Sequence, residues 1–236
     1  MNWTLVTAYV PTNDRSSQEY MSQLQRLTRA AEVAQLPRVT FLHPEMPSDS
    51  IGGVVPCRFE ELYLSPYLDD LKLDIRTPTP AKDTAAYLAV QCHKTEWVAE
   101  AAKRHPECPG FLWVDASIGK FYSDEELVVA LRRLASFPPS PTVRIPTIWP
   151  LQPLLEGLHV HHQTIVWYFA GGVFGGAREG LDTFARKMKR KTIAAMRSSR
   201  LTWEVNFWAM IYQEIPCLFD PYPSGHDKTL LERFVP

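Results

Sequence analysis

The chain has 236 residues, 45% hydrophobic and 22% charged, which predicts a globular protein with a full apolar core and excludes extensive disorder. Its 25 basic and 26 acidic side chains leave a formal net charge of -1. Nucleic acid is therefore not expected as the main partner, because binding to a phosphate backbone needs a basic surplus.

Strands and amphipathic helices alternate along the first part of the chain. Residues 5–10 are almost all apolar, which predicts a strand buried on both faces of a mostly parallel sheet. Ser16 and Glu19 have the spacing of a capping box at the start of a helix. Residues 38–42 predict a second strand, and the proline-rich residues 44–80 predict irregular structure.

The same alternation continues to the end of the chain. Asp83 is the expected N-cap of a long helix that ends near Arg104, and the apolar residues 111–114 form a strand that runs into Asp115. Further along we expect a helix over 123–134, an extended proline-rich segment over 137–150, a strand over 165–169, a helix over 178–197 and a helix from about Thr202. The pattern predicts an α/β fold with a central, mostly parallel sheet flanked by helices.

The chain shows no membrane or export signal. No apolar stretch reaches the roughly 20 residues that span a bilayer, and residues 1–15 lack a basic region ahead of an apolar one. The four cysteines are scattered, without the short paired spacings of a zinc site. We expect a cytoplasmic protein with reduced thiols and no transmembrane segment, and leave peripheral membrane association open.

Asp115 is the first candidate functional residue, because ligand groups gather where the strands of an open sheet end. A carboxylate at that edge suits a divalent metal that bridges a diphosphate, since hard cations prefer oxygen ligands. The equally weighted alternative is that its side chain caps a turn.

A glycine-rich run, GGVFGG, covers residues 171–176. Directly after an expected strand, it allows the backbone to approach a ligand closely, with Val173 and Phe174 anchoring the loop in the core. Arg178 and a helix start follow at once, which favours contact with a sugar or a diphosphate. A glycine bulge made for packing is the alternative.

Glu204 lies in the first turn of an expected helix, where the helix dipole favours an ionised carboxylate. Such a group can act as a base, a nucleophile or a cation stabiliser. Trp203 precedes it, and Trp208 follows at a spacing that places an aromatic ring beside it. Taken alone, an acidic residue in a first helical turn is ordinary helix chemistry.

Near the C-terminus, His226 and Lys228 lie in a loop after two prolines. The imidazole could complete a metal site with Asp115, and the ammonium could neutralise a phosphate. A solvated turn is the alternative. The basic run over 186–191 is read as the solvated face of a helix, with nucleic acid excluded.

Several of these segments together resemble the GT-A class of glycosyltransferases, and most of the chain resembles the bacterial HtrL/YibB-like glycosyltransferase group. The matching segments are TLVTAYV, the helix that carries Lys94, FLWVDASIG, AGGVFGG, LTWEVNFWA and GHD. A local likeness to the blood-group and alpha-1,3-galactosyltransferase family lies in the glycine loop and in the glutamate about thirty residues beyond it.

The resemblance implies roles for individual residues. Asp115 matches an acid of the DxD metal motif, Gly171 to Gly176 match the donor and acceptor loop, and Glu204 matches the catalytic carboxylate. Here the segment reads VDAS, with one acid where the motif has two. Either His226 or water replaces the second metal ligand, or binding is independent of metal.

The resemblance thus implies one GT-A-like domain over 1–236, with a nucleotide-binding half of about 1–117 and an acceptor and catalytic half of about 118–236. The expected cofactor is a divalent metal, Mn²⁺ or Mg²⁺, held by Asp115 and His226. The expected donor-binding residues are Thr7, Ala8, Tyr9, Arg15, Lys94, Asp115, Ala116 and Ser117; the sugar and acceptor residues are Gly171, Gly172, Val173, Trp203 and Trp208; and Lys228 is expected on the phosphate.

The function that follows is transfer of a sugar from a nucleotide-diphosphate sugar, UDP-sugar favoured, to a glycan or another hydroxyl acceptor. The alternative is a non-catalytic module of the same fold that binds nucleotide sugars or glycans. A weaker third reading is a nucleotidyltransferase.

Overall fold

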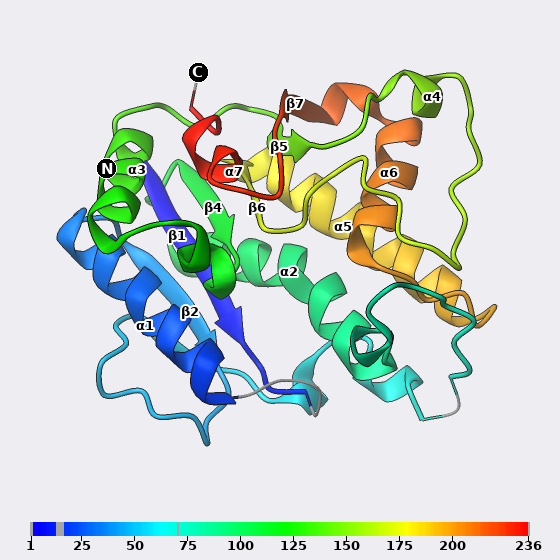
Figure 1. Cartoon of the computed structure of the whole chain (residues 1–236), viewed down its shortest axis with the longest axis horizontal. Helices are drawn as coiled ribbons and strands as arrows, with labels where there is room; N and C mark the ends of the chain where they lie inside the picture. The colour runs from blue at the N-terminus through cyan, green and yellow to red at the C-terminus, as the bar shows by residue number, and fades with distance from the viewer. Residues whose placement is uncertain (1, 13–16, 70, 236) are drawn as a thin grey trace.

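A seven-stranded sheet with helices on both faces makes up the computed structural model, which describes residues 2–12, 17–69 and 71–235 (Figure 1). Its order is β3-β2-β1-β4-β6-β5-β7, and β6 alone runs antiparallel to its neighbours β4 and β5. The strands are β1 (Trp3–Tyr9), β2 (Arg38–Leu42), β3 (Val54–Pro56), β4 (Gly110–Val114), β5 (Val143–Thr147), β6 (Val173–Ala177) and β7 (Phe219–Pro223). The expected α/β class with a mostly parallel, helix-flanked sheet is confirmed.

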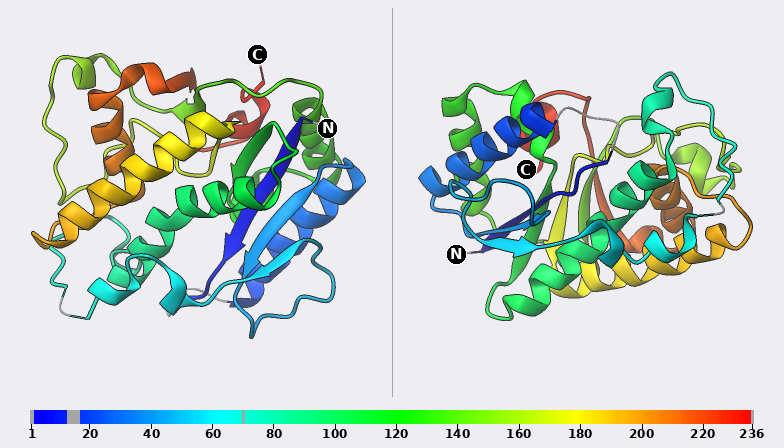
Figure 2. Two further views of the ribbon diagram at one scale, coloured as in Figure 1. Left: turned by 180° about the vertical axis from the view of Figure 1, so that it is seen from behind. Right: turned by 90° about the horizontal axis from the view of Figure 1, so that it is seen from below.

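Two helical layers cover the sheet. The longer helices are α1 (Ser17–Val33), α2 (Ala85–Arg104), α3 (Asp124–Ala135), α5 (Arg178–Met196) and α6 (Glu204–Glu214); the short ones are α4 (Gln152–Leu155), α7 (Thr229–Glu232) and the 3-10 turns η3 (Pro80–Lys82) and η4 (Ala116–Phe121). Helices α1 and α3 lie on one face, and α2, α5 and α6 lie on the other (Figure 2). Alternate residues of β4 therefore enter different cores: Phe111 and Trp113 face α2 and α5, while Leu112 and Val114 face α1 and α3.

Most of the locally encoded elements form where the sequence predicts them. Strand β2 and the capping box of Ser123 and Glu126 at α3 are as expected. Helix α2 is capped by Thr84, whose hydroxyl accepts from the Tyr87 amide, and the expected cap Asp83 is wrong. The Asp83 carboxylate instead accepts from Thr77 and from the Trp203 indole. The expected capping residue Ser16 lies outside the described residues.

The expected strand over 165–169 is wrong, and the glycine run forms β6 in its place. At Gly175 a Cβ atom would lie 2.7 Å from the Phe111 carbonyl, and at Gly176 one would lie 2.4 Å from the Thr142 carbonyl. The second glycine pair therefore serves close packing between strands. Of residues 165–169, Phe169 alone makes a bridge, to Thr147 of β5, and the segment is held by Asn206, which bonds the Val166 amide and the Thr164 carbonyl.

Among the described residues, no helix combines the length and the apolar character needed to cross a membrane. The irregular segment expected over 44–80 contains one short strand, β3, which pairs in parallel with β2 at the sheet edge.

His93 on α2 is enclosed by aromatic rings. It stacks on Tyr63 at 5.1 Å, meets Trp97 edge-on at 4.9 Å, and its Nδ1 accepts from the Tyr63 amide at 3.4 Å. Burial and the charge of Lys189 lower the pKa of His93 to about 3. The imidazole is thus neutral in the folded protein at pH values where an unfolded histidine is protonated.

His93 therefore makes the free energy of unfolding fall as the pH drops from about 6.5 towards 4, because only the unfolded state takes up the proton there, at a cost of up to about 1.4 kcal/mol per pH unit. Urea denaturation of wild type and His93→Gln at several pH values measures this contribution. The variant should show a shallower acid loss of stability, and parallel pH profiles would contradict the assignment.

Candidate functional site

Two adjoining cavities open at the edge of the sheet where β1 and β4 end. The larger has a volume of about 400 Å³ and extends over the start of α6, turn η4 and the loop around His226. The smaller, of about 40 Å³, lies between the end of β1 and helix α2. Lys94 and Asp115 line both cavities and so form the wall between them.

The ammonium group of Lys94 is the centre of this wall. Its Nζ lies 3.0 Å from Glu204 Oε1, 3.1 Å from Asp115 Oδ1 and 3.0 Å from the Gly171 carbonyl oxygen. Each of the three N–H groups thus has an acceptor: Asp115 directly after β4, Gly171 before β6 and Glu204 of α6. The side chains of Lys94 and Glu204 are 3% and 4% exposed, whereas that of Asp115 is 24% exposed and reaches the cavity.

The two carboxylates keep Lys94 charged inside the protein. Burial alone lowers the pKa of an ammonium group, but Asp115 and Glu204 outweigh it, and the pKa of Lys94 is raised above its ordinary value. The lysine therefore acts as a fixed positive charge at any physiological pH.

Glu204 is the first residue of α6, where the positive end of the helix dipole favours its carboxylate. Its Oε1 accepts from Lys94, while its buried Oε2 has no hydrogen-bond partner among the described residues. A buried acceptor without a donor is unfavourable, and this one belongs to a residue that lines the larger cavity. The second carboxylate oxygen thus keeps an unused capacity to accept a hydrogen bond or to face a positive charge.

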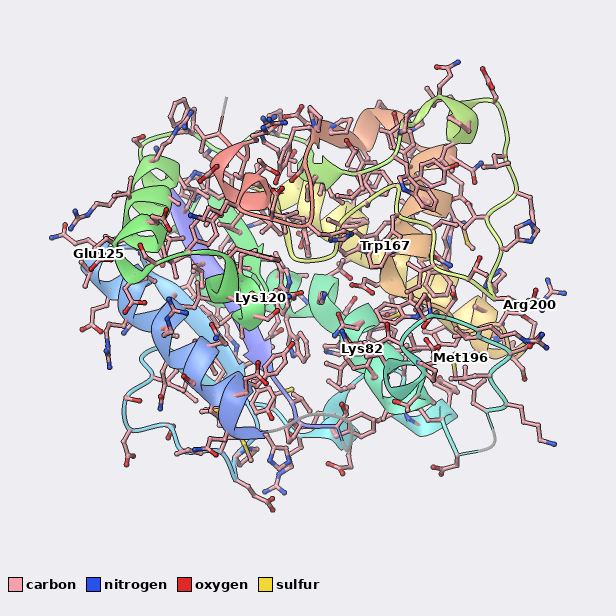
Figure 3. All side chains as sticks on the ribbon, viewed as in Figure 1. Lys82, Lys120, Glu125, Trp167, Met196 and Arg200 are labelled. Atoms are coloured by element: carbon pink, nitrogen blue, oxygen red, sulfur yellow. The ribbon has the colours of Figure 1, made fainter. Side chains whose placement is uncertain are left out.

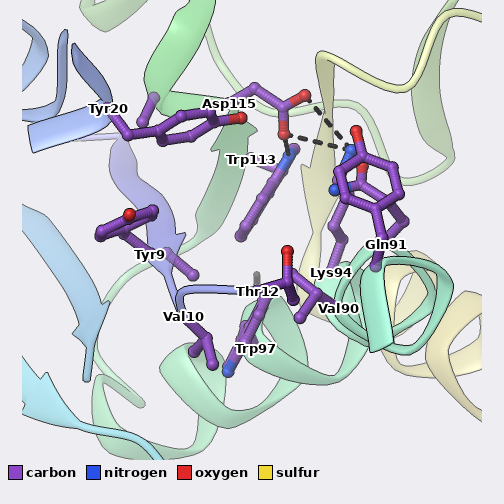
Figure 4. A pocket seen from close by; sticks show the side chains of 13 residues that line it. Tyr9, Val10, Thr12, Tyr20, Val90, Gln91, Lys94, Trp97, Trp113 and Asp115 are labelled. Atoms are coloured by element: carbon purple, nitrogen blue, oxygen red, sulfur yellow. Dashed lines mark hydrogen bonds and ion pairs between the residues drawn. The ribbon is translucent and has the colours of Figure 1, made fainter. Parts of the chain in front are cut away.

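Asp115 is held rigidly at the end of β4. Its Oδ1 accepts from the Trp113 indole at 2.8 Å (Figure 4). Its amide donates to the Gly172 carbonyl at 2.8 Å. Because β6 is antiparallel to β4, the residues just before β6 lie beside the residues just after β4. This pairing explains how a glycine 57 positions further along the chain reaches the carboxylate.

Gly171 makes room for Glu204. A Cβ atom at this position would lie 2.2 Å from Glu204 Oε1, whereas one at Gly172 would meet nothing closer than 3.7 Å. The first glycine is thus required by the packing of the charged cluster, and the second has space.

Tyrosine rings form the wall of the smaller cavity opposite Lys94. Tyr9, from the end of β1, stacks on Tyr20 of α1 with ring centres 5.1 Å apart and planes at 14°. Figure 4 shows these rings across the cavity from the Lys94 and Asp115 pair. Tyr20 also lines the larger cavity, so an aromatic surface continues from one cavity to the other.

The structure brings most of the predicted site residues together. The cavities are lined by Ala8, Tyr9, Lys94, Asp115, Ala116, Ser117, Gly171, Gly172, Trp203, Glu204 and His226. Their roles stay predictions, and Arg15 lies outside the described residues.

Four predicted residues do not line either cavity. Thr7 is fully buried beside Thr40 of β2, and Val173 is buried in the core under α7. Trp208 is fully buried and meets Phe174 and Phe184 edge-on, so the expected aromatic wall beside Glu204 is wrong. Lys228 pairs with Glu126 on the surface at 2.5 Å.

Tyr20 was not among the predicted site residues, although it lines both cavities. The larger cavity also contains Lys82, Lys120 and Trp167, which the sequence patterns did not indicate. Figure 3 shows them around the same central region of one face of the molecule. Lys120 follows Asp115 by five positions in turn η4, a proximity that could have indicated it. Trp167 holds His226 edge-on at 4.5 Å, and both come from segments whose placement local patterns do not determine.

The residues present do not fit the expected divalent metal. Mg²⁺ demands near-ideal octahedral geometry around one or two carboxylates, yet the oxygens of Asp115 already accept from Lys94 and Trp113. The described part of the chain has no group of three histidine, cysteine, aspartate or glutamate side chains that could hold a metal ion. The ammonium of Lys94 lies where such an ion would have to approach both carboxylates.

No family model and no curated protein matches the chain. Among solved structures it is similar to a glycosyltransferase involved in the glycosylation of the major capsid of PBCV-1, with a TM-score of 0.46 and 10% identity over 94% of this chain and 81% of that one. It is also similar to a CMP:2-keto-3-deoxy-manno-octonic acid synthetase complexed with CTP, with a TM-score of 0.48 and 9% identity over 95% of this chain and 90% of that one. Similarity at this level does not indicate what this chain binds, and membership of the HtrL/YibB-like group stays a prediction.

Replacing Gly171 by alanine should destabilise the protein by about 1–3 kcal/mol, because the new methyl group displaces Glu204 from Lys94. Gly172→Ala is the matched control and should cost little, since its methyl group makes only ordinary contacts. Urea denaturation of both variants measures the difference. Equal losses would contradict the packing role given to Gly171.

Lys94→Met should cost about 3–5 kcal/mol of unfolding free energy, because it leaves the buried Glu204 carboxylate without its counter-charge. Lys228→Met removes an ammonium from an exposed ion pair with Glu126 and should cost at most about 1 kcal/mol. Chemical denaturation at pH 7 compares them. A Lys94 variant as stable as the control would overturn the view that this ion cluster is structurally essential.

Proposed function

We infer that the protein transfers a sugar from a nucleotide-diphosphate sugar, with UDP-sugar favoured, to a hydroxyl group of a glycan or another acceptor. The inference rests on the buried Glu204, which lines a cavity large enough for a sugar ring. One of its carboxylate oxygens is fixed by Lys94, and the other has no partner among the described residues. The family resemblance in the motifs around Asp115, Gly171 and Glu204 adds to it.

Lys94, Asp115 and Glu204 form the inner cluster of the site, and their charges suit glycosyl transfer. One ammonium and two carboxylates meet at the wall between the cavities. The transition state of such a transfer has oxocarbenium character, with positive charge on the sugar ring. A fixed carboxylate close to that ring stabilises the developing positive charge.

The reaction moves two bonds at the anomeric carbon. The bond to the diphosphate oxygen breaks, its electron pair leaves with the diphosphate, and a bond to the acceptor oxygen forms. If Glu204 takes the acceptor proton, the configuration is inverted. If Glu204 instead attacks or stabilises the sugar from the opposite face, the acceptor oxygen then attacks from the face that the diphosphate has left. Any bond to Glu204 breaks in that step, the acceptor proton passes to the departing diphosphate, and the configuration is retained.

The nucleotide part of the donor is assigned to the side of the site that faces β1. Tyr20, stacked on Tyr9, offers an aromatic surface on which a base can lie, and such stacking contributes about 1–3 kcal/mol per base. Ala8 and Ala116 are small residues at the same edge and leave space beside these rings.

Glu204→Gln tests the assignment, because it keeps the shape of the side chain and removes its charge. We expect release of UDP from a panel of UDP-sugars to fall at least about 100-fold, while the Kd for UDP changes by no more than about threefold. Glu96→Gln, which alters an ion pair with Lys189 away from the cavities, is the matched control.

Unchanged turnover in Glu204→Gln would contradict the role of this residue. The alternative, a non-catalytic module that binds nucleotide sugars, predicts tight binding by wild type with no release of UDP from any sugar in the panel. Release of pyrophosphate from a nucleoside triphosphate would instead support a nucleotidyltransferase.

A further inference from the structure

The charged residues of the larger cavity form two separate groups. Asp115, Glu204 and Lys94 contact one another at the inner wall, with the two acids outnumbering the base. Lys82 and Lys120 line the same cavity from two other segments of the chain. The site therefore has a net acidic inner part and an outer part with two basic side chains.

The two outer lysines come from different segments. Lys82 is the last residue of turn η3, just before α2, and is half-buried. Lys120 belongs to turn η4, which begins directly after Asp115, and is exposed. Figure 3 labels both lysines on the same face of the molecule, and both line the larger cavity.

A diphosphate against the inner wall of the cavity would face the partly exposed Asp115 carboxylate. Like charges at short range repel. The leaving diphosphate, which carries the negative charge of the reaction, is therefore directed to the outer part of the cavity. The ammonium groups of Lys82 and Lys120 and the imidazole of His226 line that part.

The Lys94 ammonium also occupies the place beside Asp115 and Glu204 that a divalent metal ion would take. A divalent cation at Asp115 would meet the Lys94 ammonium, which lies 3.1 Å from Asp115 Oδ1 and 3.0 Å from Glu204 Oε1. Lys94 is buried and has all three of its hydrogen-bond acceptors in place, so its displacement by an ion would break every one of these contacts.

We propose that this protein binds the diphosphate of its nucleotide ligand without a divalent cation, with the ammonium groups of Lys82 and Lys120 on the phosphates and Lys94 fixed between Asp115 and Glu204 in place of a metal. This assignment rests on the proposed function, because it names how that site holds its donor. Two ammonium groups supply the same positive charge as one divalent ion, but from side chains that the fold positions.

Calorimetric titration with UDP tests the proposal on wild type in 1 mM EDTA (on the order of 1 mM is enough to remove free divalent ions) and in MnCl₂. We expect the Kd to agree within about twofold in the two conditions and to weaken steeply with added salt. Lys82→Met and Lys120→Met should each raise the Kd at least about tenfold. Lys103→Met, which removes an exposed lysine of α2 outside this cavity, should leave it unchanged.

Three other results would each contradict a different part of the proposal. UDP binding that is lost in EDTA and restored by Mn²⁺ would overturn the metal-free assignment and leave the proposed function standing. Variants of Lys82 and Lys120 that bind as well as Lys103→Met would overturn the phosphate roles. If UDP, GDP, CDP and ADP all fail to bind in both conditions, the proposed function fails with the inference.

Discussion

A single buried ammonium group, that of Lys94, joins the parts of the molecule that make the site. Removing an ammonium from water is strongly unfavourable, and here two carboxylates and one carbonyl oxygen offset that cost. These acceptors lie after β4, before β6 and at the start of α6, while the lysine itself is on α2. The ammonium is stabilised only when all four segments are in place, so the site depends on the complete fold.

The same constraint explains the division of the glycine run. Gly171 is small because Glu204 needs its space, and Gly175 and Gly176 are small because neighbouring backbone approaches them closely. One sequence pattern thus serves the charged cluster at one end and strand packing at the other. The sequence indicated a loop that approaches a sugar or a diphosphate, with packing as the alternative. Nothing local shows that β6 reverses direction inside the sheet or that Glu204 needs the space at Gly171.

Local signals allowed much of the fold to be predicted, and the place of Asp115 in the site as well. Strand β2, the capping box of α3 and the position of Asp115 follow from short-range patterns. Pairings across long distances in sequence could not be predicted in this way. Helical spacing shows that Trp208 and Glu204 are neighbours along α6, but which face meets the cavity depends on packing against α5 and β6, which takes Trp208 into the core. Lys82 and Trp167 belong to irregular segments, whose course is fixed by tertiary contacts alone.

We propose that the Lys94 cluster is the wall against which a nucleotide sugar is held. A crystal structure grown with UDP-glucose and MnCl₂, or with whichever UDP-sugar raises the melting temperature most, is the decisive measurement. We expect a sugar ring within hydrogen-bond distance of the Glu204 carboxylate, phosphates against Lys82 and Lys120, and Lys94 still between its two carboxylates. A sugar bound away from Glu204, or a manganese ion bridging Asp115 and the diphosphate with Lys94 displaced, would contradict it.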